Sequence, residues 1–383
     1  MLHIAQIGFF LDPQERLPQQ LLQDWWPLAR TAEGVVRSGM RVSVVQACCR
    51  TEEMTRSGVT YHFLAPELGQ PTMTRGAAFA RLIQQLEADV FHVHGLGFSQ
   101  DVLALARIAP GTPIFVQDHA GGVPSLWRRR KWRHSLAAVA GVSFCTPEQA
   151  QPFAAAALLG PRTAVYTIPE CTTQFAPTDR PEARRTTGIA ADPAVLWVGH
   201  LDPNKDPLTV LAGISAAVDR LPDLQLWCCF GTAPLMDEVR ARIDSDSRLR
   251  GRVHLLGRVA HDRMEQLMSA ADVFVLGSQR EVMGCSVLEA LACGLPPVIT
   301  DIPSYRMLTD GGRIGALWPR GDGRALADAL VSVATRPSAP TRAAVRAHFE
   351  TYLSLEAVGE KLAAAYRDVL GRTGGTVAAV TSA

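Results

Sequence analysis

The chain of 383 residues lacks an excess of charge of either sign, because 38 Lys and Arg face 37 Asp and Glu. Bulk charge therefore argues against nucleic acid as a partner. The sequence also lacks an apolar run of the roughly 20 residues needed to span a bilayer. Its start, MLHIAQIGFF, lacks the basic and apolar regions of a signal peptide. We expect a cytoplasmic protein, with peripheral attachment at the inner face of the membrane left open.

No CxxC pair and no Cys/His spacing typical of a metal site occurs among the eight cysteines. Two adjacent pairs, Cys48–Cys49 and Cys228–Cys229, lie in apolar, strand-like runs. Neighbouring side chains on a strand point to opposite faces and do not bridge easily. We therefore expect reduced, buried thiols and no metal.

Short apolar runs rich in β-formers alternate with longer segments of helical spacing throughout the chain. The expected strands are HIAQIGFF, RVSVVQA, DVFHVHG and TPIFVQDH in the first half, and AVLWVGH, LQLWCCFG, RVHLLGRV, ADVFVLGS and PPVITD in the second. This alternation predicts the α/β class, with parallel sheets covered by helices on both faces. The length favours two doubly wound, Rossmann-like lobes that bind ligands at the carboxyl ends of their strands.

Composition places the boundaries of these lobes. Four prolines and many small polar residues lie between Pro169 and Pro193, so this stretch is expected to hold the linker. An N-terminal lobe precedes it, and a C-terminal lobe, a helix that braces the lobes and a flexible tail follow. The expected bounds are 1–170, 171–192 for the linker, 193–345, 346–371 and 372–383.

The segment SQREVMGCSVLEALACGLPPVITD, residues 278–301, places two carboxylates beside the start of a predicted helix. Ser286 and Glu289 fit a capping box, which would make Glu289 structural. Glu281 instead lies at the carboxyl end of a strand, and the amides of the helix start suit a phosphate. A diphosphate on these amides, with a carboxylate on each side to accept hydroxyl hydrogen bonds, describes a bound nucleotide sugar.

The spacing of Glu281 and Glu289 resembles the E-x7-E motif of the family 4 glycosyltransferases, and neighbouring segments follow the order of that family. VGHLDPNKDPLTVL (198–211) is similar to the first strand, loop and helix of its donor lobe, and FGTAP to the next glycine turn. LLGRVAHDRMEQLMSAADVFVLGS is similar to its base-binding region. The resemblance covers nearly the whole chain, is specific mainly between 195 and 305, and implies the GT-B fold, in which two lobes face a central cleft.

The resemblance implies a role for each residue of the motif. Glu281 would contact hydroxyl groups of the donor sugar, and Glu289 would contact the ribose. The diphosphate would lie on the backbone amides of Gly284, Cys285 and Ser286.

Other donor-side residues follow from the same resemblance. Lys205 matches a lysine that neutralises phosphate, the alternative being a solvated lysine at a helix start. Next to Gly199, the family commonly has an arginine where this chain has His200, and an imidazole cannot reproduce a permanent, forked contact. Either His200 contributes less than that arginine, or Arg258 or another basic residue compensates. Arg258 and Val259 are also expected to border the base.

The acceptor side is expected in the N-terminal lobe. His119 follows a strand and matches a family histidine near the donor sugar, whereas His92 is expected to be a hydrogen-bonded core residue. For His94, a role in the site and a structural role both stay open. For Asp12, two interpretations stay open: a side chain that faces the acceptor and a polar turn. The expected catalytic residues are Glu281, His119 and Lys205.

A dense basic cluster with two tryptophans, SLWRRRKWRH, occupies residues 125–134. Three interpretations stay open: a solvated helix face, docking to an anionic membrane or a lipid-linked acceptor, and nucleic-acid binding.

We therefore expect a retaining, metal-independent glycosyltransferase that needs no cofactor and serves polysaccharide, glycolipid or glycoconjugate biosynthesis. It would move a sugar from a nucleotide diphosphate donor, a UDP-sugar rather than a GDP-sugar, to a hydroxyl of a sugar, lipid-linked or small-molecule acceptor. The alternatives are a nucleotide-sugar epimerase or phosphorylase of the same fold, and a catalytically silent partner that binds nucleotide or glycan.

Overall fold

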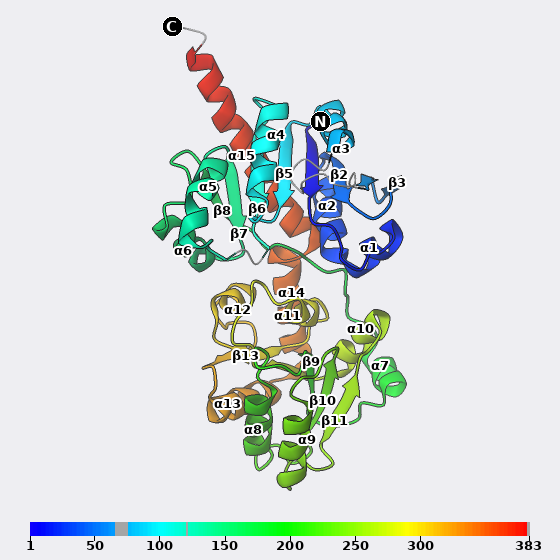
Figure 1. Ribbon diagram of the computed structural model, residues 1–383. Coiled ribbons are helices and arrows are strands. Elements are labelled where there is room, and N and C mark those ends of the chain that lie inside the picture. Colours follow the sequence, from blue (N-terminus) through cyan, green and yellow to red (C-terminus); the bar gives the residue numbers. More distant parts are fainter. Residues whose placement is uncertain (66–75, 120–121, 381–383) are drawn as a thin grey trace. The chain divides into compact units, whose positions relative to one another are not determined.

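A computed structural model describes residues 1–65, 76–119 and 122–380, and the chain forms two compact units (Figure 1). The first unit contains Met1–Thr172 and Leu355–Ala383, and the second contains Thr173–Ser354. Each unit has its own sheet with helices packed on it, so the predicted pair of α/β lobes is confirmed.

The first unit is built on an eight-stranded sheet in the order β3-β4-β2-β1-β5-β6-β7-β8. Its strands are β1 (His3–Gly8), β2 (Arg41–Ala47), β3 (Glu52–Arg56), β4 (Val59–Leu64), β5 (Val90–His94), β6 (Ile114–Gln117), β7 (Gly141–Phe144) and β8 (Ala164–Thr167). All neighbours pair in parallel except β3 and β4. Ile4 faces one apolar core and Ala5 the other, because the sheet is covered on both faces.

Helices of the first unit are α1 (Pro18–Asp24), α2 (Trp26–Arg37), α3 (Gly76–Gln85), α4 (Ser99–Ile108), α5 (Leu126–Leu136), α6 (Pro147–Ala155) and α15 (Leu355–Val380). The last of these joins the unit from the far end of the sequence and packs against α2. Two glycines permit this contact, because a Cβ atom on Gly359 would lie 2.1 Å from the carbonyl oxygen of Gly34.

The structure contains an antiparallel hairpin, β3–β4, that was not predicted from the sequence. Its two turn residues, Ser57 and Gly58, both have positive φ, at 50° and 79°. Such turns match the twist of a hairpin, and the Ser-Gly pair between two alternating segments was the sequence signal for it.

The second unit is built on a six-stranded, fully parallel sheet in the order β11-β10-β9-β12-β13-β14. Its strands are β9 (Ala194–Gly199), β10 (Gln225–Phe230), β11 (Val253–Gly257), β12 (Val273–Leu276), β13 (Pro297–Thr300) and β14 (Ala316–Trp318). Its helices are α7 (Arg180–Thr187), α8 (Pro207–Ala217), α9 (Met236–Ser245), α10 (His261–Ala270), α11 (Cys285–Ala292), α12 (Pro303–Leu308), α13 (Gly323–Ala334) and α14 (Ser338–Tyr352).

The expected linker, 171–192, differs from the observed arrangement. It contains α7, which packs on α10 within the second unit. Arg184 of α7 donates to the Asp272 carboxylate at 2.7 Å and Arg180 pairs with the same group. These charge-assisted contacts fix the segment to the unit, although its prolines resemble those of a linker.

The C-terminal region also differs from the expected bounds. In place of one helix over 346–371, α14 belongs to the second unit and α15 to the first, and the chain passes between them at Ser354 and Leu355. Helix α15 extends to Val380, and the end of the expected tail, 381–383, lies outside the described residues.

Within the described ranges, no helix is both long enough and apolar enough to cross a membrane. All eight cysteines are described and none forms a disulfide. Six are buried, but Cys49 and Cys285 are exposed, so the expectation that the thiols are buried is wrong for these two.

Candidate functional site

The order of the six strands places a topological switch point at the carboxyl edge of the second sheet. From the central strand β9 the chain continues through β10 and β11 on one side, and then returns to β12 on the other. The loops after β9 and β12 therefore diverge, and ligands bind at such switch points. Lys205 lies in the first of these loops and Glu281 in the second.

Lys205 and Glu281 form an ion pair across this switch point. The Lys205 Nζ lies 2.5 Å from Glu281 Oε1, with the two side chains 16% and 15% exposed. The side-chain amide of Asn204 also lies 3.5 Å from the same oxygen. A pair this shielded from water has a strong mutual attraction.

Further hydrogen bonds hold the two loops together. The Gln279 amide donates to the Asn204 carbonyl at 2.7 Å, and the Gln279 side chain donates to Asp206 at 2.8 Å. Asp206 also caps α8 by accepting from the Thr209 amide at 3.2 Å. The carboxylate and the ammonium of the pair are thus held on a fixed backbone.

Helix α11 begins directly after this corner with no side-chain cap. Its N-cap is Gly284 at φ 98°, where a Cβ atom would lie 2.6 Å from the Tyr305 ring. Glycine is needed there both for its conformation and for its lack of a side chain. The amides of the first turn, including that of Ser286, provide the positive end of the helix dipole for an anion.

The capping box expected from Ser286 and Glu289 is wrong. The helix begins two residues earlier than that motif requires, at Cys285 with Gly284 as its N-cap, so that Ser286 lies inside the first turn. Glu289 is instead 8% exposed, and burial raises the pKa of its carboxyl to about 8. Its side chain has no hydrogen-bond partner among the described residues, so it can accept or donate a bond to a ligand.

His200 follows Gly199 at the carboxyl end of β9 and is exposed. Its Nδ1 accepts a hydrogen bond from the Thr232 amide at 3.1 Å, so the ring proton lies on Nε2. His200 therefore presents a single Nε2–H donor where an arginine would offer a fork of several donors.

Arg258 and Val259 follow β11, at the same edge of the sheet but two strands away from β9. Arg258 is exposed, and no ion pair is found for it among the described residues. Because β11 is the edge strand of the sheet, Arg258 is placed to contact the far end of a ligand that lies along the carboxyl edge.

A cavity of about 560 Å³ opens at the carboxyl edge of the first sheet. It lies at the switch point between β1 and β5, where the chain reverses direction across the sheet. Its described lining includes the aromatic side chains Phe10, Trp25 and Phe98 and the polar side chains Asp24, Thr31, Gln46, His94, His119 and Glu170.

A chain of hydrogen-bonded side chains lines one side of this cavity. His119 Nδ1 lies 2.8 Å from the Glu170 carboxylate, and His119 Nε2 lies 3.0 Å from His94 Nδ1. His94 Nε2 lies 3.3 Å from the side-chain oxygen of Gln6. The structure thus brings His94 and His119 together, and it adds Glu170, which was not predicted.

The proton positions in this chain follow from its geometry. Burial and two neighbouring histidines hold the pKa of His94 well below its ordinary value, so His94 is neutral at pH 7. His119 donates from Nδ1 to Glu170. At the 3.0 Å contact between the two rings, one nitrogen donates and the other accepts, so a single proton is shared there.

Two other candidates in the first unit have structural roles. Asp12 is 3% exposed and accepts from the amides of Gln14 at 3.1 Å and Arg16 at 3.2 Å, so it forms a turn rather than an acceptor contact. His92 is buried and bonds the Tyr366 hydroxyl at 2.6 Å, which confirms the core role. Gly121, close after His119 in the sequence, lies outside the described residues.

Sequence inspection missed Glu170 because strand β8, which precedes it, was not recognised. Once β8 is placed at the edge of the sheet, Pro169 and Glu170 follow its carboxyl end. An acidic residue just after a strand end was the signal available in the sequence.

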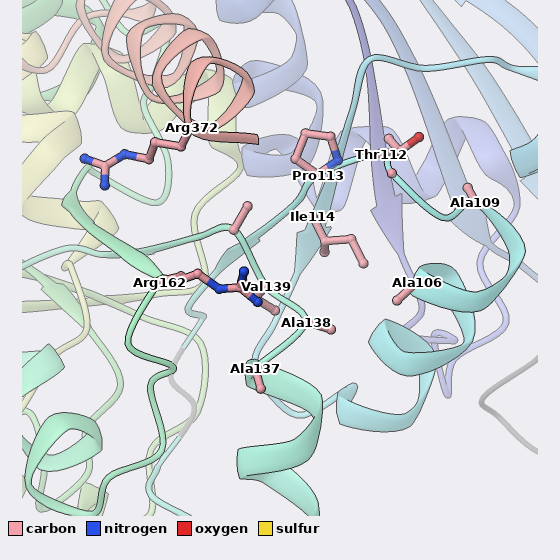
Figure 2. Close-up of a pocket in the computed structure, with 12 residues that line it drawn as sticks. Ala106, Ala109, Thr112, Pro113, Ile114, Ala137, Ala138, Val139, Arg162 and Arg372 are labelled. Atoms are coloured by element: carbon pink, nitrogen blue, oxygen red, sulfur yellow. The ribbon is translucent and has the colours of Figure 1, made fainter. Parts of the chain in front are cut away.

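A second cavity of about 360 Å³ opens at the opposite, amino-terminal edge of the same sheet (Figure 2). Alanines and other small residues line it, and Figure 2 shows the side chains of Arg162 and Arg372 at its margin. Because ligands of doubly wound sheets bind at the carboxyl edge, we do not assign this cavity to the site.

Known proteins resemble the chain in both sequence and structure. Residues 192–336 match the family described as "Glycosyl transferases group 1". The GDP-mannose:cellobiosyl-diphosphopolyprenol alpha-mannosyltransferase of Xanthomonas oryzae pv. oryzae is 26% identical over 64% of this chain and 65% of its own length. The 2-deoxystreptamine N-acetyl-D-glucosaminyltransferase of Streptomyces fradiae is 28% identical over 89% of this chain and 80% of its own length.

Solved structures share the fold over nearly the whole chain. The sucrose-phosphate synthase of Thermosynechococcus elongatus has a TM-score of 0.72 at 19% identity, covering 97% of this chain and 100% of its own. The Anabaena protein HepE, solved with UDP, has a TM-score of 0.69 at 17% identity, covering 96% of this chain and 100% of its own.

Proposed function

Since this chain is a member of the group 1, or family 4, glycosyltransferases with the GT-B fold, we propose that it transfers a sugar from a nucleotide diphosphate donor to an acceptor hydroxyl. The observation that carries the proposal is the Lys205–Glu281 pair beside the uncapped start of α11. A cation, a carboxylate and helix amides at a strand switch point match the parts of a nucleotide sugar.

Lys205 and the helix start act on the departing diphosphate. Negative charge grows on this group as its bond to the sugar breaks, and the amides of Gly284, Cys285 and Ser286 with Lys205 stabilise that charge. When a donor enters, Lys205 exchanges its contact with Glu281 for the phosphate. Glu281 is then released to accept hydrogen bonds from the sugar hydroxyls, so the two residues change partners together.

Glu289 binds the ribose in this proposal. Its carboxyl is protonated in the empty protein at pH 7, because burial raises its pKa to about 8. Two ribose hydroxyls that donate hydrogen bonds favour the charged carboxylate and lower this pKa. Donor binding near pH 7 is therefore coupled to the release of a proton.

The donor base and the stereochemistry also form part of the proposal. We assign UDP ahead of GDP, and retention of the anomeric configuration without a metal. His200 contributes its single Nε2–H to the donor, and Arg258 with Val259 borders the base. The Xanthomonas oryzae relative is named for GDP-mannose and the HepE structure holds UDP, so both bases belong in the test.

The first unit supplies the acceptor side of the reaction. Its cavity has aromatic walls that suit the apolar face of a sugar ring, and hydrogen-bonding groups that suit hydroxyls. The His119–His94 chain hydrogen-bonds the acceptor hydroxyl. As the new bond forms, the proton of this hydroxyl passes to the phosphate leaving group. The sugar, lipid-linked or small-molecule acceptor meets the protein in the cytoplasm or at its membrane.

A donor screen tests this function. UDP- and GDP-sugars are ranked by their increase in melting temperature, and the best donor is incubated with acceptor mixtures for mass analysis. A product heavier than its acceptor by one sugar residue supports the proposal. An isomerised donor with no adduct contradicts it in favour of an epimerase, and stabilisation without turnover contradicts it in favour of a silent binding partner.

A further inference from the structure

Helix α5 presents a basic and aromatic face outward from the first unit. Trp127, Arg130, Lys131 and His134 share one side of the helix by their spacing, and all four are exposed. The opposite side, which includes Trp132 and Leu136, is buried in the core. The helix is therefore anchored by one tryptophan and displays the other.

The first turn of α5 is unusually apolar for a surface. Leu126 and Trp127 are each 76% exposed, and the Arg128 guanidinium lies 4.6 Å from the centre of the Trp127 ring. No acidic residue occurs in the helix sequence LWRRRKWRHSL. A solvated helix face carries mixed charges and has no need of an exposed Leu-Trp pair, so this surface is suited to a partner.

The basic residues of the helix fall into two groups. Arg133 donates to the carbonyls of Ala157 at 3.0 Å and Ala156 at 3.1 Å, so its guanidinium fixes the helix to the unit. Arg128, Arg130 and Lys131 have no ion pair among the described residues. Three cations next to an apolar pair form a surface complementary to an anionic bilayer, where tryptophan lies at the headgroups.

The position of this surface relates it to the acceptor cavity. Helix α5 connects the carboxyl end of β6 to the amino end of β7, and these strands are parallel. Its first turn therefore lies at the carboxyl edge of the sheet, where His119 and the cavity are found. The described lining of that cavity contains no lysine or arginine, so its side chains offer no cation to a phosphate on the acceptor.

From this arrangement we propose that α5 docks the protein on an anionic membrane, where the cavity takes the sugar of a lipid-linked acceptor. The side chains of Leu126 and Trp127 enter the interface, and Arg128, Arg130 and Lys131 contact lipid phosphates. The inference of a lipid-linked acceptor rests on the proposed function, whereas membrane docking can be measured without any turnover.

Cosedimentation with vesicles tests the docking. The wild-type chain is expected to bind vesicles of phosphatidylglycerol and phosphatidylcholine, to release them as salt increases, and not to bind phosphatidylcholine alone. Each cation near an anionic surface contributes about five-fold, so Arg128→Gln/Arg130→Gln/Lys131→Gln should weaken partitioning about a hundred-fold. Trp127→Ala should weaken it about ten-fold by loss of apolar burial.

A matched control removes three exposed cations elsewhere. Arg240→Gln/Arg250→Gln/Arg263→Gln changes the net charge equally on the second unit and should leave partitioning within two-fold of wild type, as expected for a local surface. Equal loss in both triple variants would overturn the assignment to α5. Absence of wild-type binding to anionic vesicles would overturn the docking itself, as would tighter binding to single-stranded nucleic acid than to these vesicles.

The failure of this inference is distinguishable from the failure of the proposed function. Transfer to a water-soluble acceptor by a chain that ignores vesicles would overturn membrane docking and leave glycosyl transfer intact. Vesicle binding through α5 by a chain that turns over no donor would overturn glycosyl transfer and leave docking intact. Faster transfer to a lipid-linked acceptor in anionic vesicles, lost in the α5 triple variant, would support both.

Discussion

The two carboxyl edges of this molecule are built from different chemistry. At the second sheet, charge dominates: an ion pair, a helix dipole and one buried carboxyl surround a switch point. At the first sheet, aromatic walls and a chain of histidines surround a switch point of the same topology. The same topology thus supports two different binding edges. One suits an anionic ligand group that does not vary, and the other suits a largely neutral ligand group that can vary.

The largest expected effect on transfer comes from removing a charge at the carboxyl edge of the second sheet. Lys205→Gln removes the side-chain cation proposed to stabilise the leaving phosphate, and should lower kcat/KM about 10²- to 10³-fold. Glu281→Ala should lower it at least as far, since it also leaves Lys205 unpaired and largely shielded from water. Steady-state kinetics with the donor found by the screen measure both.

Arg280→Gln is the matched control for this pair. Arg280 is exposed and adjacent to Glu281 in the sequence, yet its guanidinium contacts nothing described in the site. Its loss should change kcat/KM less than two-fold, as for an exposed charge. If Arg280→Gln impairs transfer as strongly as Lys205→Gln, diffuse positive charge rather than a placed cation supports the reaction.

The helix start of the charged edge can be tested by adding one methyl group. Gly284→Ala should destabilise the protein by about 3 kcal/mol, because it combines a positive φ with a clash against Tyr305. Gly251→Ala has a positive φ of 75° but open space around it, so it should cost only about 1 kcal/mol. Chemical denaturation measures both, and equal losses would contradict the role of the close approach.

Glu289 gives the charged edge a stability that falls as pH rises. Its pKa is raised from 4.5 to about 8, so the folded state binds a proton that the unfolded state releases. Stability contributed by this group is present below pH 4.5 and is lost as pH rises toward 8, by about 1 kcal/mol between pH 6 and 7. Glu289→Gln should remove this slope, as measured by denaturation at each pH.

The smallest expected effect concerns the histidine chain of the first unit. Glu170→Gln retains a hydrogen-bond acceptor for His119 but removes the charge, and should raise the KM for acceptor a few-fold, since the pair is half-exposed. It should also shift the pH profile of transfer while leaving donor binding unchanged. An altered affinity for donor would show that Glu170 does not act at the acceptor edge.

The two edges also differ in how far the sequence predicts them. All nine predicted strands are present, because parallel strands buried on both faces are continuous apolar runs. Glu281 and the helix start were predicted because they follow a recognisable strand, and Lys205 was named through the family resemblance, but the ion pair between Lys205 and Glu281 was not predicted. The contacts of Asn204 and Gln279 that join the two loops were not predicted, because they depend on the register of loop backbones.

At the first edge, sequence predicts less. His94 and His119 follow recognisable strands, but Glu170 follows β8, a short edge strand that is half-exposed and therefore lacks an apolar run. The capping box at Ser286 failed for a related reason, since a local motif cannot show that Gly284 packs on Tyr305 and starts the helix earlier. Tertiary packing decided both cases.

The central claim is that the start of α11 and Lys205 together hold a nucleoside diphosphate, and hydrogen–deuterium exchange of the full-length chain with UDP or GDP tests it most directly. The account predicts slower exchange at amides 283–288 and around Lys205, reduced or absent in Lys205→Gln, with little change around His94 and His119. Binding of either nucleotide with unchanged exchange at 283–288 would contradict it.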